Sequence, residues 1–117
     1  MKIIQKPWGY ELWFAHTDKY AGKLIILKKG HRTSLQYHQV KHETLYIDEG
    51  LLKLIIEDEN HNLITHIFSP GDAITVPPNT KHRLEAIKDS RIIEVSTPEL
   101  DDVVRVEDDY HRESFES

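Results

Sequence analysis

Hydrophobic and polar residues alternate along this chain in short runs that turn residues separate. Val, Ile, Leu, Tyr and Thr recur at every second position, a spacing typical of β-strands, and no long segment has a helical period. Gly, Pro, Asn and Asp gather between the runs, where turns are expected. The pattern predicts strands over residues 10–15, 22–29, 33–38, 43–49, 51–58, 63–68, 73–77, 82–87 and 90–97.

Many short strands in one small chain predict an all-β fold, either an antiparallel sandwich or a barrel. With 117 residues the chain has the size of one domain with one core. We therefore expect a single domain over residues 1–117, with the barrel between about residues 20 and 98 and a strand segment before it. The tail, residues 99–117, is expected to carry a short strand at "VVRV" among acidic residues and to fray at its end.

The amino-acid composition argues against some binding partners and limits the residues that could bind a metal. The net charge of −5 argues against nucleic acid, because binding to phosphate backbones needs a basic face. No apolar run approaches a membrane span, and the N-terminus lacks the apolar block of a signal peptide. We therefore expect a cytoplasmic protein that binds neither nucleic acid nor membranes. Without cysteine, a metal site has to use His, Glu, Asp, Gln or Asn, and the chain has eight histidines.

The stretch "SLQYHQVKHETL", residues 34–45, concentrates such ligands. A helix would place His38 and His42 on one face, but the neighbouring residues favour a strand, which places Gln36 and His38 on the same side. Glu43 then begins the next strand, and His82 enters a later one. The pattern predicts that Gln36, His38, Glu43 and His82 share a site for divalent Zn, Mn, Fe, Co or Ni.

Two linked motifs resemble those of the cupin superfamily. A cupin's first motif has a glycine, a His-x-His pair, a glutamate and a closing glycine, and here Gln36 stands in place of the first histidine. The matching residues are Gly30, Gln36, His38, Glu43 and Gly50 in the first motif and Gly71, Pro77, Asn79 and His82 in the second. The resemblance implies a single jelly-roll barrel. A glutamine at the first position resembles the phosphomannose isomerases, whose site of Gln, His, Glu and His implies zinc as the metal.

The resemblance extends to both ends of the chain. "KPWGYE" and "LDDVVRVEDDYHR" look like the opening and closing segments of the C-terminal cupin domain of type II mannose-6-phosphate isomerases. Larger members carry a nucleotidyltransferase domain ahead of it, and we expect this chain to lack that domain because 117 residues have no room for it. Arg105 and Arg112 match arginines that the family implicates in substrate handling, and Lys41 stands where an arginine is common. These three residues are predicted to contact substrate. For the two arginines, surface salt bridges to Asp101, Asp102 or Asp108 are the alternative.

The sequence also departs from that family around the predicted site. Thr44 and Leu45 replace a His-Trp pair, and Asn79 and His111 replace glycines. Asn tolerates left-handed backbone angles, so the change at Asn79 is mild. The remaining six histidines are expected to be exposed or merely packed, and Trp8 and Trp13 to pack over the barrel or a partner subunit.

Three functions remain open. The first is a metal-dependent sugar-phosphate isomerase that converts aldose to ketose through an enediol, with His42 or a metal-bound hydroxide as candidate base. The second is a non-catalytic accessory protein that binds a sugar or a nucleotide sugar. The third is an iron or manganese oxygenase, which Gln36 disfavours because oxygenase cupins more often use three histidines. Exposed strand edges predict a homodimer in each case.

Overall fold

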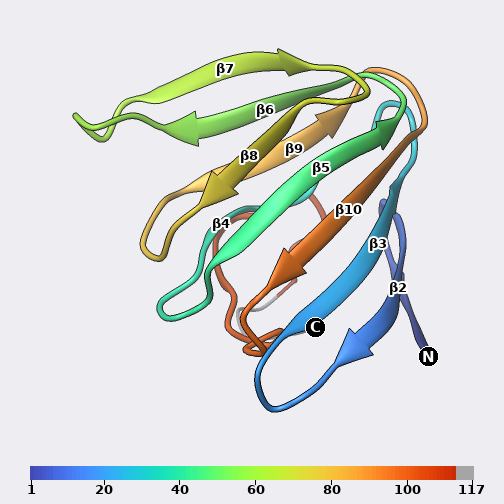
Figure 1. Ribbon diagram of the computed structural model, residues 1–117. Coiled ribbons are helices and arrows are strands. Elements are labelled where there is room, and N and C mark those ends of the chain that lie inside the picture. The colour runs from blue at the N-terminus through green and yellow to red at the C-terminus, as the bar shows by residue number, and fades with distance from the viewer. Residues whose placement is uncertain (113–117) are drawn as a thin grey trace.

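The chain folds into two antiparallel β-sheets that face each other (Figure 1), and the computed structural model describes residues 1–112. These residues form eleven strands, and they contain no helix that could cross a membrane. The six-stranded sheet contains, in spatial order, β1 (Lys2–Lys6), β2 (Gly9–His16), β3 (Ala21–Leu27), β10 (Ser90–Ser96), β5 (Glu43–Glu49) and β8 (Ala73–Val76). The five-stranded sheet contains β11 (Val104–Glu107), β4 (Leu35–Tyr37), β9 (His82–Ala86), β6 (Leu52–Glu57) and β7 (Leu63–Phe68).

Strand positions agree with the hydrophobic pattern at every predicted run, including the short strand of the tail. One strand, β1, was not predicted. Its sequence "KIIQK" does not alternate, and β1 pairs with β2 at the edge of its sheet, where one neighbour suffices. The predicted fraying concerns residues 113–117, which lie outside the described part of the chain.

The hydrophobic core lies between the two sheets. Alternating residues of β5, β6 and β10 point inward, so each strand is buried at every second position. Burying such side chains stabilises the fold by about 1.5–3 kcal/mol each. The core consists of Trp8, Ile25, Leu27, Leu45, Ile47, Leu52, Leu54, Ile56, Val76, Leu84, Ala86 and Ile92.

Several turns contain a residue with positive φ, among them the turns at Asn79 and Gly50. Asn79, at φ 61°, occupies the turn before β9, and its amide donates a 2.6 Å hydrogen bond to the carbonyl of His38. Gly50, at φ 103°, joins β5 to β6. A Cβ atom there would lie 2.3 Å from the Ser90 hydroxyl, so this tight turn requires glycine. The turn at Asn79 matters for function because it ties the entry of β9 to His38.

Candidate metal centre

Three potential metal ligands converge between the sheets. His38 follows β4, Glu43 begins β5 and His82 begins β9, and all three are buried. Glu43 Oε1 lies 3.4 Å from His38 Nε2 and 3.2 Å from His82 Nε2. The ligand atoms of the three residues lie within 4.8 Å of one another. Zinc bonds of about 2.0–2.1 Å in tetrahedral geometry place neighbouring ligands about 3.3 Å apart, so these separations fit a bound ion.

Backbone carbonyls fix the orientation of both imidazoles. The Nδ1 atom of His38 lies 2.6 Å from the carbonyl oxygen of Asp102, and Nδ1 of His82 lies 2.9 Å from that of Thr80. Because a carbonyl can only accept, each Nδ1 carries the proton and each Nε2 of a neutral ring presents a lone pair to Glu43. This is the arrangement of metal-binding histidines, whose other ring nitrogen bonds a carbonyl or carboxylate. Nε2 of His38 is buried and has no hydrogen-bond partner among residues 1–112.

Gln36 lies beside this cluster. It pairs with His82 across β4 and β9, and its side chain lines the same cavity as the three ligands. Its Oε1 accepts a 2.7 Å hydrogen bond from the buried Ser34 hydroxyl. An amide oxygen has two lone pairs, so this bond leaves one for a metal. The donor set of two imidazoles, one carboxylate and one amide oxygen fits a divalent ion such as zinc.

A chain of buried charges extends from Glu43 along the inner face of the six-stranded sheet. Lys41 Nζ lies 3.0 Å from Glu43 Oε2 and 2.9 Å from Glu94 Oε2. Lys23 Nζ lies 3.8 Å from the same Glu94 oxygen and 3.1 Å from Glu11 Oε2. The other oxygen of Glu11 accepts a 3.0 Å bond from the Trp13 indole. Carboxylates and ammonium groups thus alternate through the interior, and each charge has an opposite charge beside it.

Burial and pairing shift the pKa values of these groups in opposite directions. Burial alone would raise the pKa of Glu43, but the neighbouring ammonium group of Lys41 lowers it well below its ordinary value. At Glu94 burial dominates and, with the nearby charge of Glu43, raises the pKa to about 7. Burial would lower the pKa of Lys41, but Glu94 and Glu43 raise it. Glu43 is therefore a carboxylate and Lys41 an ammonium group at neutral pH.

The cluster lines a cavity of about 60 Å³ whose wall also carries cations. Arg105 and Arg112 come from the C-terminal segment, and Lys6 ends β1. Arg112 is held by Asp108, with bonds of 3.0 and 3.2 Å. Lys6 forms no ion pair with any described residue, and burial, with neighbouring Lys23, Arg112 and Arg105, lowers its pKa to about 8. This part of the wall can attract an anion.

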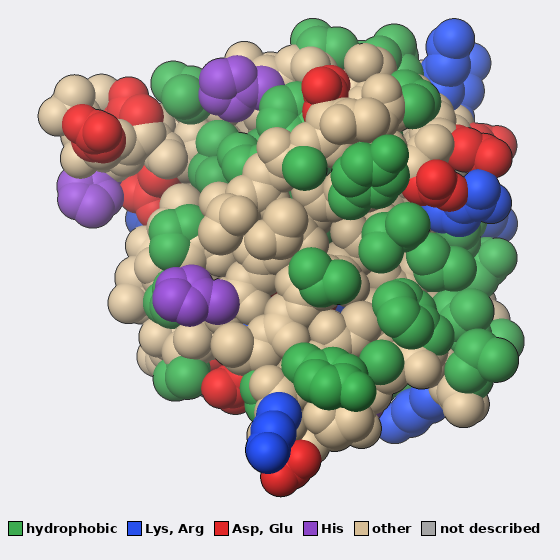
Figure 2. All heavy atoms as spheres, in the orientation of Figure 1, with side chains coloured by type: hydrophobic (Ala, Val, Ile, Leu, Met, Phe, Trp, Pro, Cys, Tyr) green, Lys and Arg blue, Asp and Glu red, His purple; other side chains and the backbone are tan. Residues whose placement is uncertain are grey.

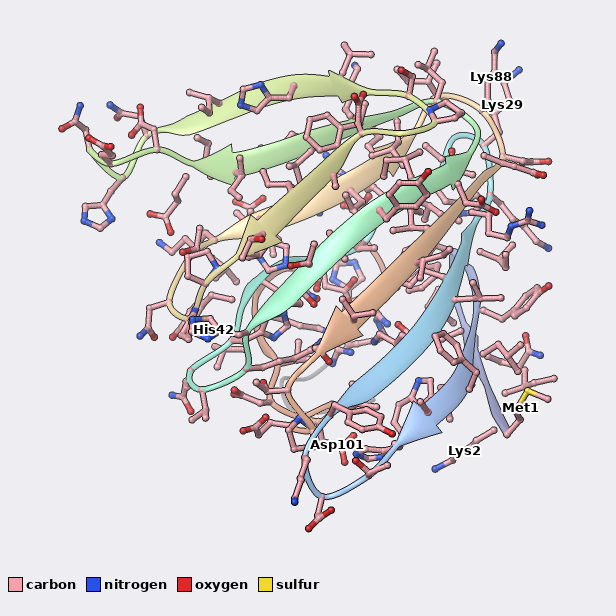
Figure 3. All side chains as sticks on the ribbon, viewed as in Figure 1. Met1, Lys2, Lys29, His42, Lys88 and Asp101 are labelled. Carbon is pink, nitrogen blue, oxygen red and sulfur yellow. The ribbon has the colours of Figure 1, made fainter. Side chains whose placement is uncertain are left out.

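All seven residues predicted for the site line this one cavity: Gln36, His38, Lys41, Glu43, His82, Arg105 and Arg112. His42, by contrast, is exposed immediately before β5 (Figure 3) and does not line the cavity. Trp8 belongs to the core and lines the cavity, whereas Trp13 packs in a smaller cluster with Ala21 and Leu100.

The sequence analysis missed four charged residues that line the cavity, Lys6, Glu11, Lys23 and Glu94. A signal for three of them was present. Glu94 has the same parity as Ile92 in its strand, Lys23 the same as Ile25, and Glu11 the same as Trp13. A charged residue at an inward-facing position predicts a buried partner. Lys6 carried no such signal because its strand does not alternate.

A curated relative aligns with almost the whole of this chain. Mannose-1-phosphate guanylyltransferase 2 of Escherichia coli O157:H7 is 27% identical over 115 residues, which is 94% of this chain. The matched region is 23% of that protein, so the chain spans about a quarter of its length.

Solved structures share the fold. KdgF from Halomonas sp. superimposes with a TM-score of 0.75 at 24% identity, covering 87% of this chain and 90% of that protein. Oxalate decarboxylase from Bacillus subtilis superimposes with a TM-score of 0.77 at 16% identity, covering 90% of this chain and 30% of that protein. At these identities the similarity establishes the architecture alone, which confirms the predicted jelly roll.

The family assignment rests on sequence as well. The family model described as "Cupin domain" matches residues 23–96, which include the three clustered ligands and most of both sheets. The resemblance in the two motifs is thereby confirmed at the level of the superfamily. This chain is a member of the cupin family.

Proposed function

We propose that this cupin binds a divalent metal through Gln36, His38, Glu43 and His82, and that this metal is zinc. One observation carries the proposal: two imidazoles, each fixed through Nδ1 by a backbone carbonyl, present Nε2 to the same buried carboxylate oxygen. Two lone pairs and an anionic oxygen repel one another unless a cation or a proton lies between them. A bound metal would also satisfy the buried Nε2 of His38.

The ligand we propose is a hexose phosphate. Lys6, Arg105 and Arg112 line the cavity that contains the metal ligands, and guanidinium groups suit the binding of phosphate. The buried charge chain of three carboxylates and two ammonium groups has one net negative charge when all are ionised, so a divalent ion makes the centre positive. The name of the curated relative, mannose-1-phosphate guanylyltransferase, supports a sugar phosphate.

The reaction we propose is the interconversion of an aldose phosphate and a ketose phosphate. When bound, the metal supplies polarisation of the sugar carbonyl and stabilises the negative charge that develops on its oxygen. Lys41 stays protonated between two carboxylates, so it adds positive charge to the centre and does not act as the base. Arg105 and Arg112 hold the phosphate, and Leu45 and Leu84 form an apolar part of the cavity wall.

A second candidate function is sugar-phosphate binding without turnover, which is favoured by Thr44 and Leu45, the residues that replace the His-Trp pair of the resembling family next to Glu43. For both candidate functions the cavity is small. Its volume of about 60 Å³ is far below the roughly 300–1,000 Å³ of pockets that enclose small ligands. It has room for a metal and about four water molecules. A whole hexose phosphate enters only if the C-terminal segment moves, and Asp108 holds Arg112 in that segment in place.

Elemental analysis and turnover test the proposal together. Protein purified without chelator should contain zinc or another divalent metal, and His82→Ala should lose it. His66→Ala is the matched control, because His66 is exposed on β7. Metal-loaded protein should interconvert mannose 6-phosphate and fructose 6-phosphate. Thermal stabilisation by these sugars without conversion would support the binding protein instead, and unchanged metal content in His82→Ala would refute the metal site.

We also propose that the protein forms a homodimer through the outer face of the six-stranded sheet. Figure 2 shows hydrophobic side chains spread over the face that β5, β10, β3 and β2 form in Figure 1. Tyr46 and Val95, on β5 and β10, are 43% and 54% exposed there, and Phe14 on β2 is 46% exposed. Exposed apolar patches of this kind often mark interaction sites, and a second copy of the chain offers a matching one.

Light scattering at micromolar concentration should therefore report a dimer. Val95→Glu places a charge on this face, on the strand between β3 and β5, and should yield monomers with an unchanged circular dichroism spectrum. Ile67→Glu, at an exposed position of β7 in the other sheet, is the control and should remain dimeric. A monomeric wild-type protein would rule this interface out.

A further inference from the structure

Lys41 is a lysine with almost no access to solvent. Its side chain is 2% exposed, although lysine is almost never fully buried unless it is paired. The loop that carries it is held by Asp102, whose carboxylate accepts bonds from the amides of Val40 and Lys41 at 2.7 and 3.0 Å. The carbonyl of Asp102 also fixes the ring of His38. One residue thus anchors both Lys41 and a proposed metal ligand.

The two oxygens of Glu43 have different partners. Oε1 faces the imidazoles of His38 and His82, whereas Oε2 lies 3.0 Å from Lys41 Nζ. A charge-assisted bond of this length holds the carboxylate against rotation. Nζ is itself fixed on the other side by Glu94, at 2.9 Å. Glu43 can therefore offer one oxygen to a metal while the other is engaged.

We infer that Lys41 is a positioning residue, which reserves Oε2 of Glu43 and so makes Glu43 a ligand through Oε1 alone. The inference rests on the proposed metal centre. Groups that hydrogen-bond to metal ligands set the orientation of those ligands, and their removal typically weakens metal binding about 10- to 100-fold. Without Lys41, Glu43 can rotate or bind the metal through both oxygens.

The neighbouring Lys23 provides a matched control. It is also a buried ammonium group of the same sheet, but its ion pairs are with Glu11 and Glu94 and not with Glu43. Removing either charge should destabilise the fold, because each leaves buried carboxylates without a partner. Only the removal of Lys41 should change how Glu43 is oriented toward the metal.

The test compares wild type, Lys41→Met and Lys23→Met by competition for zinc against a chromophoric chelator, and by the absorption spectrum of the cobalt-loaded proteins. We expect Lys41→Met to bind zinc about 10- to 100-fold more weakly and to shift the cobalt bands, which report coordination geometry. Lys23→Met should keep wild-type affinity and the wild-type spectrum. If Lys41→Met does not fold, the double variant Lys41→Met/Glu94→Gln removes both charges and gives the same readouts.

Each result decides a different question. Wild-type affinity and an unchanged cobalt spectrum in Lys41→Met, or in the double variant, would overturn the inference while the proposed metal site stands. An equal loss of affinity in Lys23→Met would also overturn it, because the network's charge and not the contact with Glu43 would then set the affinity. Failure of the wild-type protein to bind any divalent metal would overturn the proposed function, and the inference with it.

Discussion

The interior between the sheets has two ends of opposite character, although the same strands build both. On β5 the inward residues run from Glu43 to Ile47, and on β3 they run from Lys23 to Leu27. The charged residues gather at the end near His42, and the aliphatic ones toward the loops of Lys29 and Lys88 (Figure 3). Alternation decides that a residue points inward, but its position along the strand decides whether its neighbours are charged or aliphatic.

The two ends of the interior contribute differently to the protein. The aliphatic end contains side chains such as Leu52 and Ile92 that are fully buried and carry no polar group, so it supplies stability. The charged end contains the histidines and Glu43, where burial makes every charge depend on its partner. Substitutions at one end should therefore change stability, and those at the other should change ligand binding or its dependence on pH.

The largest effect should follow a truncation at the aliphatic end. Leu54 is completely buried in β6, and Leu54→Ala should lower the free energy of unfolding by about 2–5 kcal/mol in urea denaturation. The folded variant should keep its metal content, because Leu54 does not line the cavity of the ligands. Loss of metal from the folded variant would show that the two ends are coupled.

A smaller effect should follow the loss of the outermost carboxylate of the charge chain. Glu11→Gln removes the partner of Lys23 and weakens the bond with Trp13, so it should lower the free energy of unfolding by about 1.5–3 kcal/mol at neutral pH. Burial would raise the pKa of Glu11, but Lys23 and Lys6 lower it below the ordinary value of 4.5.

The sign of the pH dependence follows from that shift. The stability that ionised Glu11 contributes is present above pH 4.5 and is lost as the pH falls through its lower folded pKa. The difference between wild type and Glu11→Gln should therefore shrink below pH 4.5, as urea denaturation at several pH values can measure. Glu59→Gln, in an exposed turn, should behave as wild type throughout. A constant difference would contradict the prediction.

The smallest effect should concern the cations of the cavity wall. Lys6→Met should weaken the binding of mannose 6-phosphate to the metal-loaded protein about fivefold at neutral pH, as measured by calorimetry. Because burial lowers the pKa of Lys6 to about 8, wild-type affinity should fall as the pH rises through 8 and approach that of the variant. Lys2→Met, on the same strand but outside this cavity, is the control. An identical pH profile in Lys6→Met would exclude Lys6 from the anion site.

Local pattern was sufficient to predict most of the strands. Runs such as "LLKLIIED" alternate regularly, and the turns between them carry Gly, Asn or Pro where positive φ or a chain reversal is required. Asn79 illustrates the point, because its predicted tolerance of left-handed angles corresponds to an observed φ of 61°. β1 was not predicted. It lies at a sheet edge and is a strand because it pairs with β2, although its own residues do not alternate between hydrophobic and polar.

The sequence by itself determined that the fold is all-β, which positions point inward, and that Gln36, His38, Glu43 and His82 stand at the spacing of a cupin site. Only the tertiary structure decided that Glu43 divides its two oxygens between imidazoles and Lys41, and that Glu94 completes the charge chain. The physical reason is that alternation is a property of neighbouring residues. The meeting of Glu11, Lys23 and Glu94 depends on the order β2, β3, β10, which joins segments far apart in the chain.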